Sequence, residues 1–184
     1  AVTLTDNMTN GGIASHGIVK GKRLVVTGVL TQSSIAYAVA QLAQEQGAQI
    51  VLTSPPRTVS LTSRIAARLP QPVEALALDV TDDNDLASLN DRVAEHLGEV
   101  DGILHAIGFA PESALGGGFM TTPWPDVATA MHVSTYRLVS LTRALAPSLT
   151  PKASVVGLDF DATVAWPSYD WMGVAKAALE SASR

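Results

Sequence analysis

The hydrophobic positions of the chain alternate between short continuous runs and longer stretches with helical spacing. Arg23 to Thr27 is a short, β-branched run that ends at Gly28. From Ser33 onward, apolar residues recur three and four positions apart, as on one face of a helix. This change of period repeats along the chain. It predicts further strands at 49–53, 73–80, 100–107 and 153–158, and further helices at 57–69, 82–97, 125–149 and from 168 onward.

Short strands that alternate with helices of a dozen or more residues indicate βαβ units, which form a parallel sheet covered on both faces. Because crossovers between parallel strands are right-handed, we predict a doubly wound α/β fold of the Rossmann type with five strands. Ligands bind such sheets beyond the carboxyl ends of the strands. The segments expected at that edge are residues 28–35, 53–56, 79–80, 106–109 and 158–160.

Composition is that of one globular domain. The chain has 184 residues, of which 47% are hydrophobic and 16% charged, and its net charge of −5 includes no basic stripe that could bind nucleic acid. It has no cysteine and only isolated histidines, so we expect no metal site. Without a run of about 18 apolar residues, we expect no membrane span and a cytoplasmic location. Residues 1–17 are expected to be a flexible segment before a domain at 18–184.

Tyr169 and Lys176 are the strongest candidates for chemistry. If the chain is helical from about residue 168, these seven residues turn through about 700° and rise roughly 10 Å, which places both side chains on one face. A phenol can donate a hydrogen bond to an oxygen that gains negative charge, and an ammonium group can bind a sugar diol. An ordinary amphipathic helix has the same spacing, and the spacing alone favours that simpler interpretation.

The turn after the first strand is a second candidate. Residues 27–36 keep only the first glycine of G-x-G-x-x-G, Gly28, and have Ser33 and Ser34 where a helix should begin. A helix start with free N–H groups and serine hydroxyls suits a pyrophosphate. Serine is equally common as a plain N-cap, so the segment alone leaves both interpretations open.

Six segments carry a resemblance to a known family. They are T-G-V-L-T-Q-S-S-I-A (27–36), Q-E-Q-G-A-Q-I-V-L-T (44–53), L-D-V (78–80), H-A-I-G-F (105–109), V-G-L-D-F-D (156–161) and Y-D-W-M-G-V-A-K-A-A-L-E-S (169–181). Together they resemble the NADH-dependent enoyl-acyl-carrier-protein reductases, a branch of the short-chain dehydrogenase/reductase superfamily. The likeness to the mycobacterial long-chain type is close.

The last segment is the most specific part of this resemblance. Tyr169, Met172 and Lys176 fit the Tyr-x-x-Met-x-x-x-Lys form of enoyl reductases, whereas the superfamily at large has Tyr-x-x-x-Lys. The superfamily also has a catalytic serine about 13 residues before its tyrosine, and Val156 stands at that distance here. The resemblance therefore disfavours a carbonyl-reducing alcohol dehydrogenase.

The resemblance implies a cofactor, NADH, and a role for each residue around it. Contacts with the pyrophosphate side are implied for Gly28, Ser34 and Ile35, with the adenine for Asp79 and Val80, and with the adenosine ribose for Ile107 and Gly108. Lys176 would bind the nicotinamide ribose, Phe160 would lie beside the nicotinamide, and Tyr169 would stabilise an enolate. The acyl chain would face Phe109, Ala110, Leu115 and Met172.

The implied reaction is reduction of the trans-2 double bond of a fatty enoyl thioester, carried on acyl-carrier protein or coenzyme A, in type II fatty acid or mycolic acid biosynthesis. A noncatalytic dinucleotide-binding module and another short-chain reductase are the alternatives. Members of the superfamily associate through two helices, here 126–149 and 168–183, both of which carry apolar residues on more than one side. We therefore expect a homo-oligomer, and by the resemblance a tetramer.

Two departures from the family stand out. After the second strand, Ser54-Pro-Pro-Arg57 replaces a glycine and an aromatic residue, and an arginine there could pair with the 2′-phosphate of NADPH. Similar arginines occur in relatives that use NADH, so we expect NADH. The sequence also stops at Arg184, where the family continues for roughly another third, so we expect the family's last strands to be absent.

Overall fold

The computed structural model describes residues 17–184, and most of the segment expected to be flexible lies outside them. Five parallel strands form one sheet in the order β3-β2-β1-β4-β5. The strands are β1 (Arg23–Thr27), β2 (Gln49–Ser54), β3 (Ala75–Ala77), β4 (Val100–His105) and β5 (Leu149–Gly157). The α-helices are α1 (Ile35–Glu45), α2 (Val59–Ala66), α3 (Asp83–Leu97), α4 (Trp124–Met131), α5 (Arg137–Leu145) and α6 (Asp170–Ser183). A π-helical segment, η2 (His132–Tyr136), joins α4 to α5.

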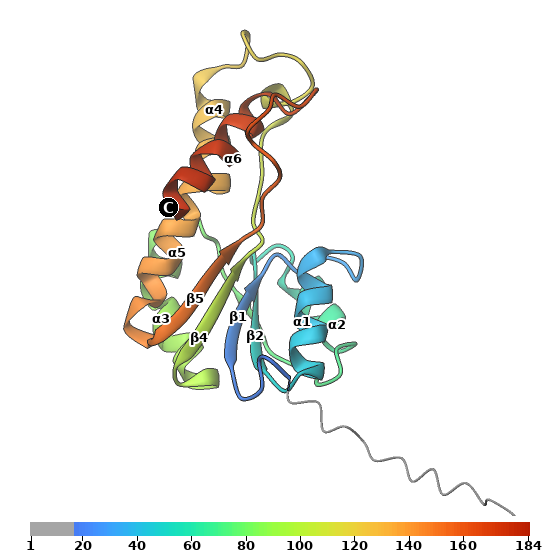
Figure 1. Ribbon diagram of the computed structural model, residues 1–184, viewed down its shortest axis with the longest axis vertical. Coiled ribbons are helices and arrows are strands. Elements are labelled where there is room, and N and C mark those ends of the chain that lie inside the picture. The colour runs from blue at the N-terminus through green and yellow to red at the C-terminus, as the bar shows by residue number, and fades with distance from the viewer. Residues whose placement is uncertain (1–16) are drawn as a thin grey trace, which may run out of the picture.

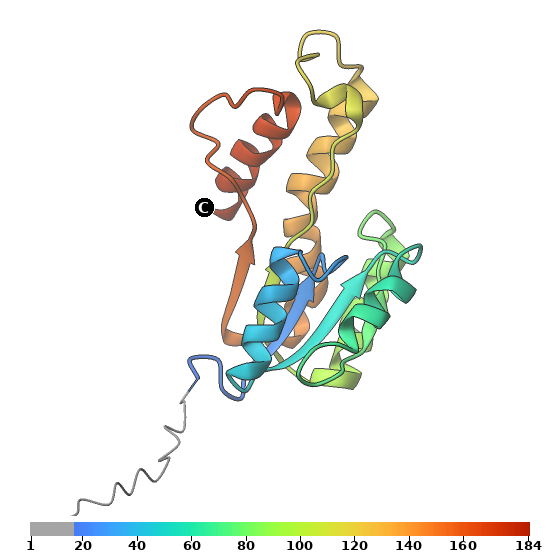
Figure 2. The same ribbon diagram turned by 90° about the vertical axis from the view of Figure 1, so that its right-hand side faces the viewer.

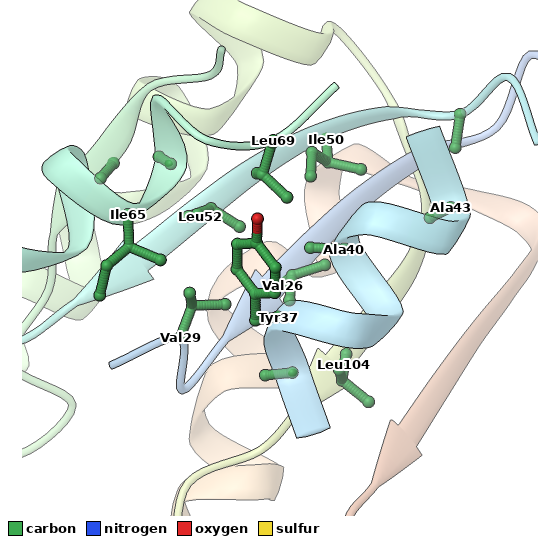
Figure 3. Packing of buried hydrophobic residues seen from close by; sticks show 14 residues of the cluster. Val26, Val29, Tyr37, Ala40, Ala43, Ile50, Leu52, Ile65, Leu69 and Leu104 are labelled. Atoms are coloured by element: carbon green, nitrogen blue, oxygen red, sulfur yellow. The ribbon is translucent and has the colours of Figure 1, made fainter. Parts of the chain in front are cut away.

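Neighbouring residues of each central strand serve two different cores. Val26 of β1 packs with α1 and α2, whereas Val25 packs with α3 and α5, because successive side chains of a strand point to opposite faces. Figure 3 shows the first core, in which Tyr37 of α1 lies among aliphatic side chains from β1, β2, β4 and α2. The two helix pairs cover opposite faces of the sheet, which confirms the doubly wound fold (Figure 1).

The order of the strands reverses between β1 and β4. β1 pairs with β2 on one side and with β4 on the other, all in parallel. The crossovers on the two sides of this point run in opposite directions. In open α/β sheets the ligand crevice is expected at such a point, which here is at the carboxyl ends of β1 and β4. Helices α4 and α6 stand side by side beyond these ends (Figures 1 and 2). The expected convergence of five strand ends at one edge is confirmed.

Several element boundaries differ from the sequence prediction. The third strand is only Ala75–Ala77, because it pairs with no more than the last three residues of β2. The long helix expected at 125–149 is divided by η2 and ends in a 3₁₀ turn at Ala146–Ser148. The predicted last residue of this helix, Leu149, instead begins β5. Pro151 is tolerated in β5 because this strand lies at the edge of the sheet and has an irregular register against β4.

Another difference concerns the helix that carries Lys176. It begins at Asp170, and Tyr169 is its N-cap. Ser168 and Asp170, on either side of Tyr169, have positive φ values of 65° and 37°, so the backbone turns sharply there. The expectation that Tyr169 lies within the helix was therefore wrong. The conformation of the preceding loop, rather than helical geometry alone, sets the position of the phenol.

Gly28 allows the ends of β1 and β4 to approach closely. Its φ is +81°, and a Cβ atom built on it would lie 2.1 Å from the carbonyl oxygen of Ala106. We expect Gly28→Ala to lower the free energy of unfolding by about 3 kcal/mol, from left-handed strain plus overlap. The matched control is Gly98→Ala, where φ is +72° but nothing lies within 4 Å of the new methyl group. It should cost about 1 kcal/mol. If urea unfolding shows that the two variants lose the same free energy of unfolding, the close approach of Gly28 to Ala106 is contradicted.

Candidate functional site

Hydroxyl side chains hold the loops around the crevice in place. Thr27 Oγ1 donates to the carbonyl oxygen of Leu104 at 2.9 Å and accepts the N–H of Ala106 at 2.9 Å, which joins the ends of β1 and β4. Thr62 of α2 donates to the carbonyl oxygen of Val29 at 2.8 Å and so fixes the β1–α1 turn. Sequence reasoning missed both threonines. Thr27, directly before Gly28, could have been suspected, but Thr62 gives no local signal.

The first turn of α1 presents backbone donors to the crevice. Ser34 is the N-cap, and its hydroxyl accepts the N–H of Tyr37 at 3.4 Å while donating to the carbonyl oxygen of Thr31 at 2.6 Å. The capping interpretation is therefore confirmed. It does not compete with a phosphate for the N–H groups of Ile35 and Ala36, which precede the first intrahelical bond. Ile35 itself is 65% exposed.

The segment after β3 is where the resemblance predicts contact with the adenine. Asp79 accepts hydrogen bonds from the N–H and the hydroxyl of Thr81 at 2.8 and 2.6 Å, and these bonds lower the pKa of Asp79. The positive charges of Arg137 and Arg57 lower it further. The Val80 side chain is buried in the core with α3, so only its backbone can contact a ligand. An ionised carboxylate thus faces this end of the crevice.

The segment after β4 and the helix α6 meet at Gly108. A Cβ atom built on Gly108 would lie 3.9 Å from Lys176 Nζ and 3.9 Å from Ser134 Oγ. Ile107 packs against the core shared with α3 and α5, and Phe109 is half exposed. The backbone at Gly108 thus lies next to the Lys176 ammonium group, and its contact with a ribose stays a prediction.

Lys176 is buried at the carboxyl ends of the sheet, with 8% of its surface exposed. Its Nζ donates to the carbonyl oxygen of Leu158, directly after β5, at 2.7 Å. Burial lowers the pKa of Lys176, and the negative charge of Asp159 acts in the opposite direction. An ammonium group held here, short of water, is placed to bind a diol or another polar group that enters the crevice.

Tyr169 and Phe160 form the next part of the site. Their ring centroids lie 4.6 Å apart at an interplanar angle of 54°, so Phe160 supports the tyrosine ring. Tyr169 is 45% exposed. Non-glycine residues with positive φ are strained, and such strain is concentrated at functional sites. Both neighbours of Tyr169 have it, which adds an independent reason to place chemistry at this residue.

The start of α6 is tied to the loop that follows Leu115. The N–H of Gly116 donates to the carbonyl oxygen of Ser168 at 3.0 Å, and Trp171 Nε1 donates to that of Phe119 at 3.0 Å. The rings of Phe119 and Trp171 also stack, with centroids 4.6 Å apart. Leu115 is thereby brought to the same end as Tyr169. Ala110 lies earlier on this loop and Met172 in the first turn of α6, but their contact with an acyl chain stays a prediction.

His105 is a buried titratable residue that sequence reasoning did not assign to the site. It ends β4, has no exposed surface, and neither ring nitrogen has a hydrogen-bond partner among the described residues. Burial, and next the charge of Lys176, lower the pKa of His105 from 6.5 to about 4. The folded protein therefore holds His105 in its neutral form at pH values where the unfolded chain would protonate it.

This difference predicts how stability depends on pH. Below pH 6.5 the unfolded chain gains a proton at His105, which the folded chain does not gain until about pH 4. The free energy of unfolding therefore decreases as the pH is lowered from 6.5 to about 4. The contribution approaches about 3 kcal/mol. In His105→Leu this part of the decline should disappear while the carboxylate contributions remain. Parallel urea-unfolding curves for both proteins between these pH values would contradict the prediction.

Residues 17–184 meet neither the requirements of a metal cluster nor those of a membrane-spanning helix. No group of three or more histidine, aspartate or glutamate side chains in this range is arranged to hold a metal ion. No helix in the same range is long and apolar enough to cross a membrane. The candidate site consists of Lys176, the Tyr169–Phe160 pair and the backbone of the strand ends.

The fold and the site define a Rossmann-type α/β protein of the short-chain dehydrogenase/reductase class. The family model described as "Enoyl-(Acyl carrier protein) reductase" matches residues 28–184, and the chain belongs to this family. The enoyl-acyl-carrier-protein reductase (NADH) of Mycolicibacterium smegmatis is 46% identical over 172 residues, which cover 91% of this chain and 64% of the relative. The resemblance inferred from the motifs is confirmed.

Two other relatives bear similar names. The enoyl-acyl-carrier-protein reductase (NADH) of Mycobacterium avium is 43% identical over 91% of this chain and 63% of its own length. The enzyme of the same name from Aquifex aeolicus is 35% identical, again over 91% of this chain and 63% of its own length. The chain thus spans a little under two thirds of the length of these relatives.

Proposed function

We propose that this chain forms the cofactor-binding and catalytic part of an NADH-dependent enoyl-acyl-carrier-protein reductase. The observation that carries the proposal is the junction of Lys176 with the backbone at Gly108 and Leu158, next to the Tyr169–Phe160 pair. The names of the mycobacterial relatives support both the reaction and the cofactor. The alternative of a noncatalytic dinucleotide-binding module shares the first part of this site but has no use for an exposed Tyr169 held between two residues of strained backbone.

NADH, when bound, supplies the hydride that is added to the β-carbon of a trans-2-enoyl thioester. The electrons of the double bond then move toward the thioester oxygen, and the Tyr169 hydroxyl donates a hydrogen bond to it as its charge grows. Lys176 would hold the ribose hydroxyls of the bound cofactor through its ammonium group, and Phe160 supports the tyrosine ring. A proton taken up at the α-carbon completes the reduction.

The choice between NADH and NADPH depends on the adenosine end. Arg57 is exposed and lies near enough to Asp79 to lower the pKa of its carboxyl group. Because Asp79 is ionised, it offsets part of the charge that Arg57 could offer to a 2′-phosphate. We therefore propose NADH as the cofactor, and acyl-carrier protein or coenzyme A as the carrier of the substrate. The cytoplasmic location is part of the same proposal.

The decisive experiment follows NADH oxidation with a medium-chain trans-2-enoyl thioester, using a chain that spans the full length of the relatives. Turnover with NADH, and at least about tenfold lower kcat/KM with NADPH, is the expected result. Tight binding of NADH without turnover on any enoyl thioester would favour the noncatalytic module. Turnover of a ketone in place of the enoyl thioester would instead identify a different short-chain reductase.

We also propose that the full-length protein is a homo-oligomer, in its complete form a tetramer. Much of the apolar surface on the helices expected at the interface is already buried within one chain, because α4, η2 and α6 pack against one another (Figure 2). Tyr136 of η2, Val139 of α5 and Val174 of α6 remain exposed. These three residues are the proposed contact between subunits, in an isologous arrangement.

The assembly prediction is tested by adding a charge. Val139→Glu should shift the mass measured by light scattering toward that of the monomer at micromolar concentration, because an unpaired carboxylate would be buried in the contact. Leu42→Glu on α1, which is also an exposed apolar position, is the matched control and should leave the mass unchanged. A monomeric full-length protein would refute the proposal outright.

A further inference from the structure

The π-helical segment η2 presents two consecutive buried hydroxyl groups. Ser134 has no exposed surface and Thr135 has 9%, and they belong to the only π-helical turn among residues 17–184. The turn is closed by a hydrogen bond from the N–H of Arg137 to the carbonyl oxygen of His132, five residues back. Such turns are rare and occur often at functional sites, because the extra residue redirects side chains that a regular helix could not aim.

Ser134 faces the segment after β4. Its hydroxyl accepts the N–H of Phe109 at 2.9 Å and donates to the carbonyl oxygen of the same residue at 2.8 Å. Both polar backbone groups of one residue are thus satisfied by a single side chain 25 residues away. The backbone of Gly108, adjacent to Phe109, is consequently held at a fixed distance from η2.

Thr135 faces α6. Its hydroxyl donates to the carbonyl oxygen of Ala175 at 2.6 Å, and Ala175 directly precedes Lys176. This bond adds a polar contact to the packing between η2 and α6, which lie side by side (Figure 2). The bond fixes the position of α6 along its own axis relative to η2, in the turn from which the Lys176 side chain extends.

We propose that Ser134 and Thr135 are positioning residues that together set the place of the Lys176 ammonium group relative to the Gly108 backbone. Neither hydroxyl needs to touch the cofactor, since one holds the loop and the other holds the helix. The loop and the helix meet at Gly108. A Cβ atom built on Gly108 would lie 3.9 Å from both Lys176 Nζ and Ser134 Oγ. The positioning itself is independent of the proposed function. Its consequence, tighter binding of the nicotinamide ribose, rests on that function.

Two local measurements on the full-length chain test the positioning without any cofactor. In Thr135→Val, the pKa of Lys176, followed by NMR of its side chain, should rise toward the ordinary value because α6 is released and the ammonium group gains water. In Ser134→Ala, hydrogen exchange of the Phe109 amide should accelerate about tenfold or more, because the N–H loses its partner. Thr135→Ser, which keeps the hydroxyl, should restore the wild-type pKa.

Matched controls remove hydroxyl groups that bond only within their own helical segment. Thr129 donates to the carbonyl oxygen of Pro125 at 2.8 Å, and within residues 17–184 the Ser140 hydroxyl forms hydrogen bonds only with Arg137, at 3.4 and 3.5 Å. Thr129→Val and Ser140→Ala should therefore leave the Lys176 pKa and the Phe109 exchange rate unchanged. If the controls move these readouts as much as the test variants do, or if the test variants move neither, the proposal is overturned.

A third measurement connects the positioning to the cofactor. Thr135→Val should raise the Kd for NADH about fivefold, but should add nothing in a Lys176→Met background if it acts through the ammonium group. If the effects of Thr135→Val and Lys176→Met on the Kd for NADH are additive, Thr135 does not act through the Lys176 ammonium group. If the wild-type protein does not bind NADH while the two local readouts still respond, the proposed function fails and the positioning role stands.

Discussion

Replacing Tyr169 with phenylalanine should lower kcat by about 100-fold or more while changing the Kd for NADH by less than about threefold. In the proposed mechanism the hydroxyl acts on negative charge that is present in the transition state and absent from the substrate, so its loss should affect the chemical step rather than binding. The ring should stay in place, because its packing against Phe160 and the backbone turn at Ser168 do not involve the hydroxyl.

Steady-state kinetics with a fluorescence titration of NADH separate these two quantities. Tyr136→Phe is the matched control, since Tyr136 is also about half exposed but lies on η2, with the Arg137 guanidinium over its ring. It should keep its wild-type kcat. A Tyr169→Phe variant that turns over at the wild-type rate would remove Tyr169 from the mechanism.

Replacing Lys176 with methionine should raise the Kd for NADH by about 100-fold. The ammonium group is the proposed partner of the ribose hydroxyls, and hydrogen bonds to a charged group contribute about 1.5–3 kcal/mol each. Methionine fills a similar volume but cannot donate. At saturating NADH, kcat should fall by a smaller factor than the affinity.

The same substitution should leave the fold intact. Lys176 is buried and its only hydrogen bond among the described residues is to Leu158, so the loss of one bond is offset by no longer burying a charge. We expect Tm to change by no more than a few degrees. Lys152→Met, at an exposed lysine of β5, is the control and should alter neither Tm nor affinity. Unchanged NADH affinity in Lys176→Met would contradict the assigned role.

Local patterns in the sequence determined the elements and many of their ends. The β-branched run 23–27 is β1 in full, and Ser34 and Asp82 begin α1 and α3 as N-caps. These features can be read locally because the interactions that specify them, caps and side-chain periodicity, join residues at most four positions apart. The Tyr-x-x-Met-x-x-x-Lys spacing likewise indicates the family by sequence alone, and the family match confirms it.

The tertiary structure alone decided where helices were interrupted and which buried groups meet. The division of the expected helix 125–149 at η2 has no local signal, because Ser134 and Thr135 find their partners 25 and 40 residues away. The position of Tyr169 at the N-cap depends in the same way on a loop that is bound to residues 116–119.

His105 shows most clearly which properties the sequence alone does not determine. The sequence places it at the end of a buried strand, but its lowered pKa follows from the packing of β4 and from the charge of Lys176 on α6. Hydrophobic period and local hydrogen bonding determined the order, type and approximate length of the elements of this protein. The geometry of its site was decided by contacts between segments far apart in the chain, whose energies depend on distances and desolvation that only the folded arrangement sets.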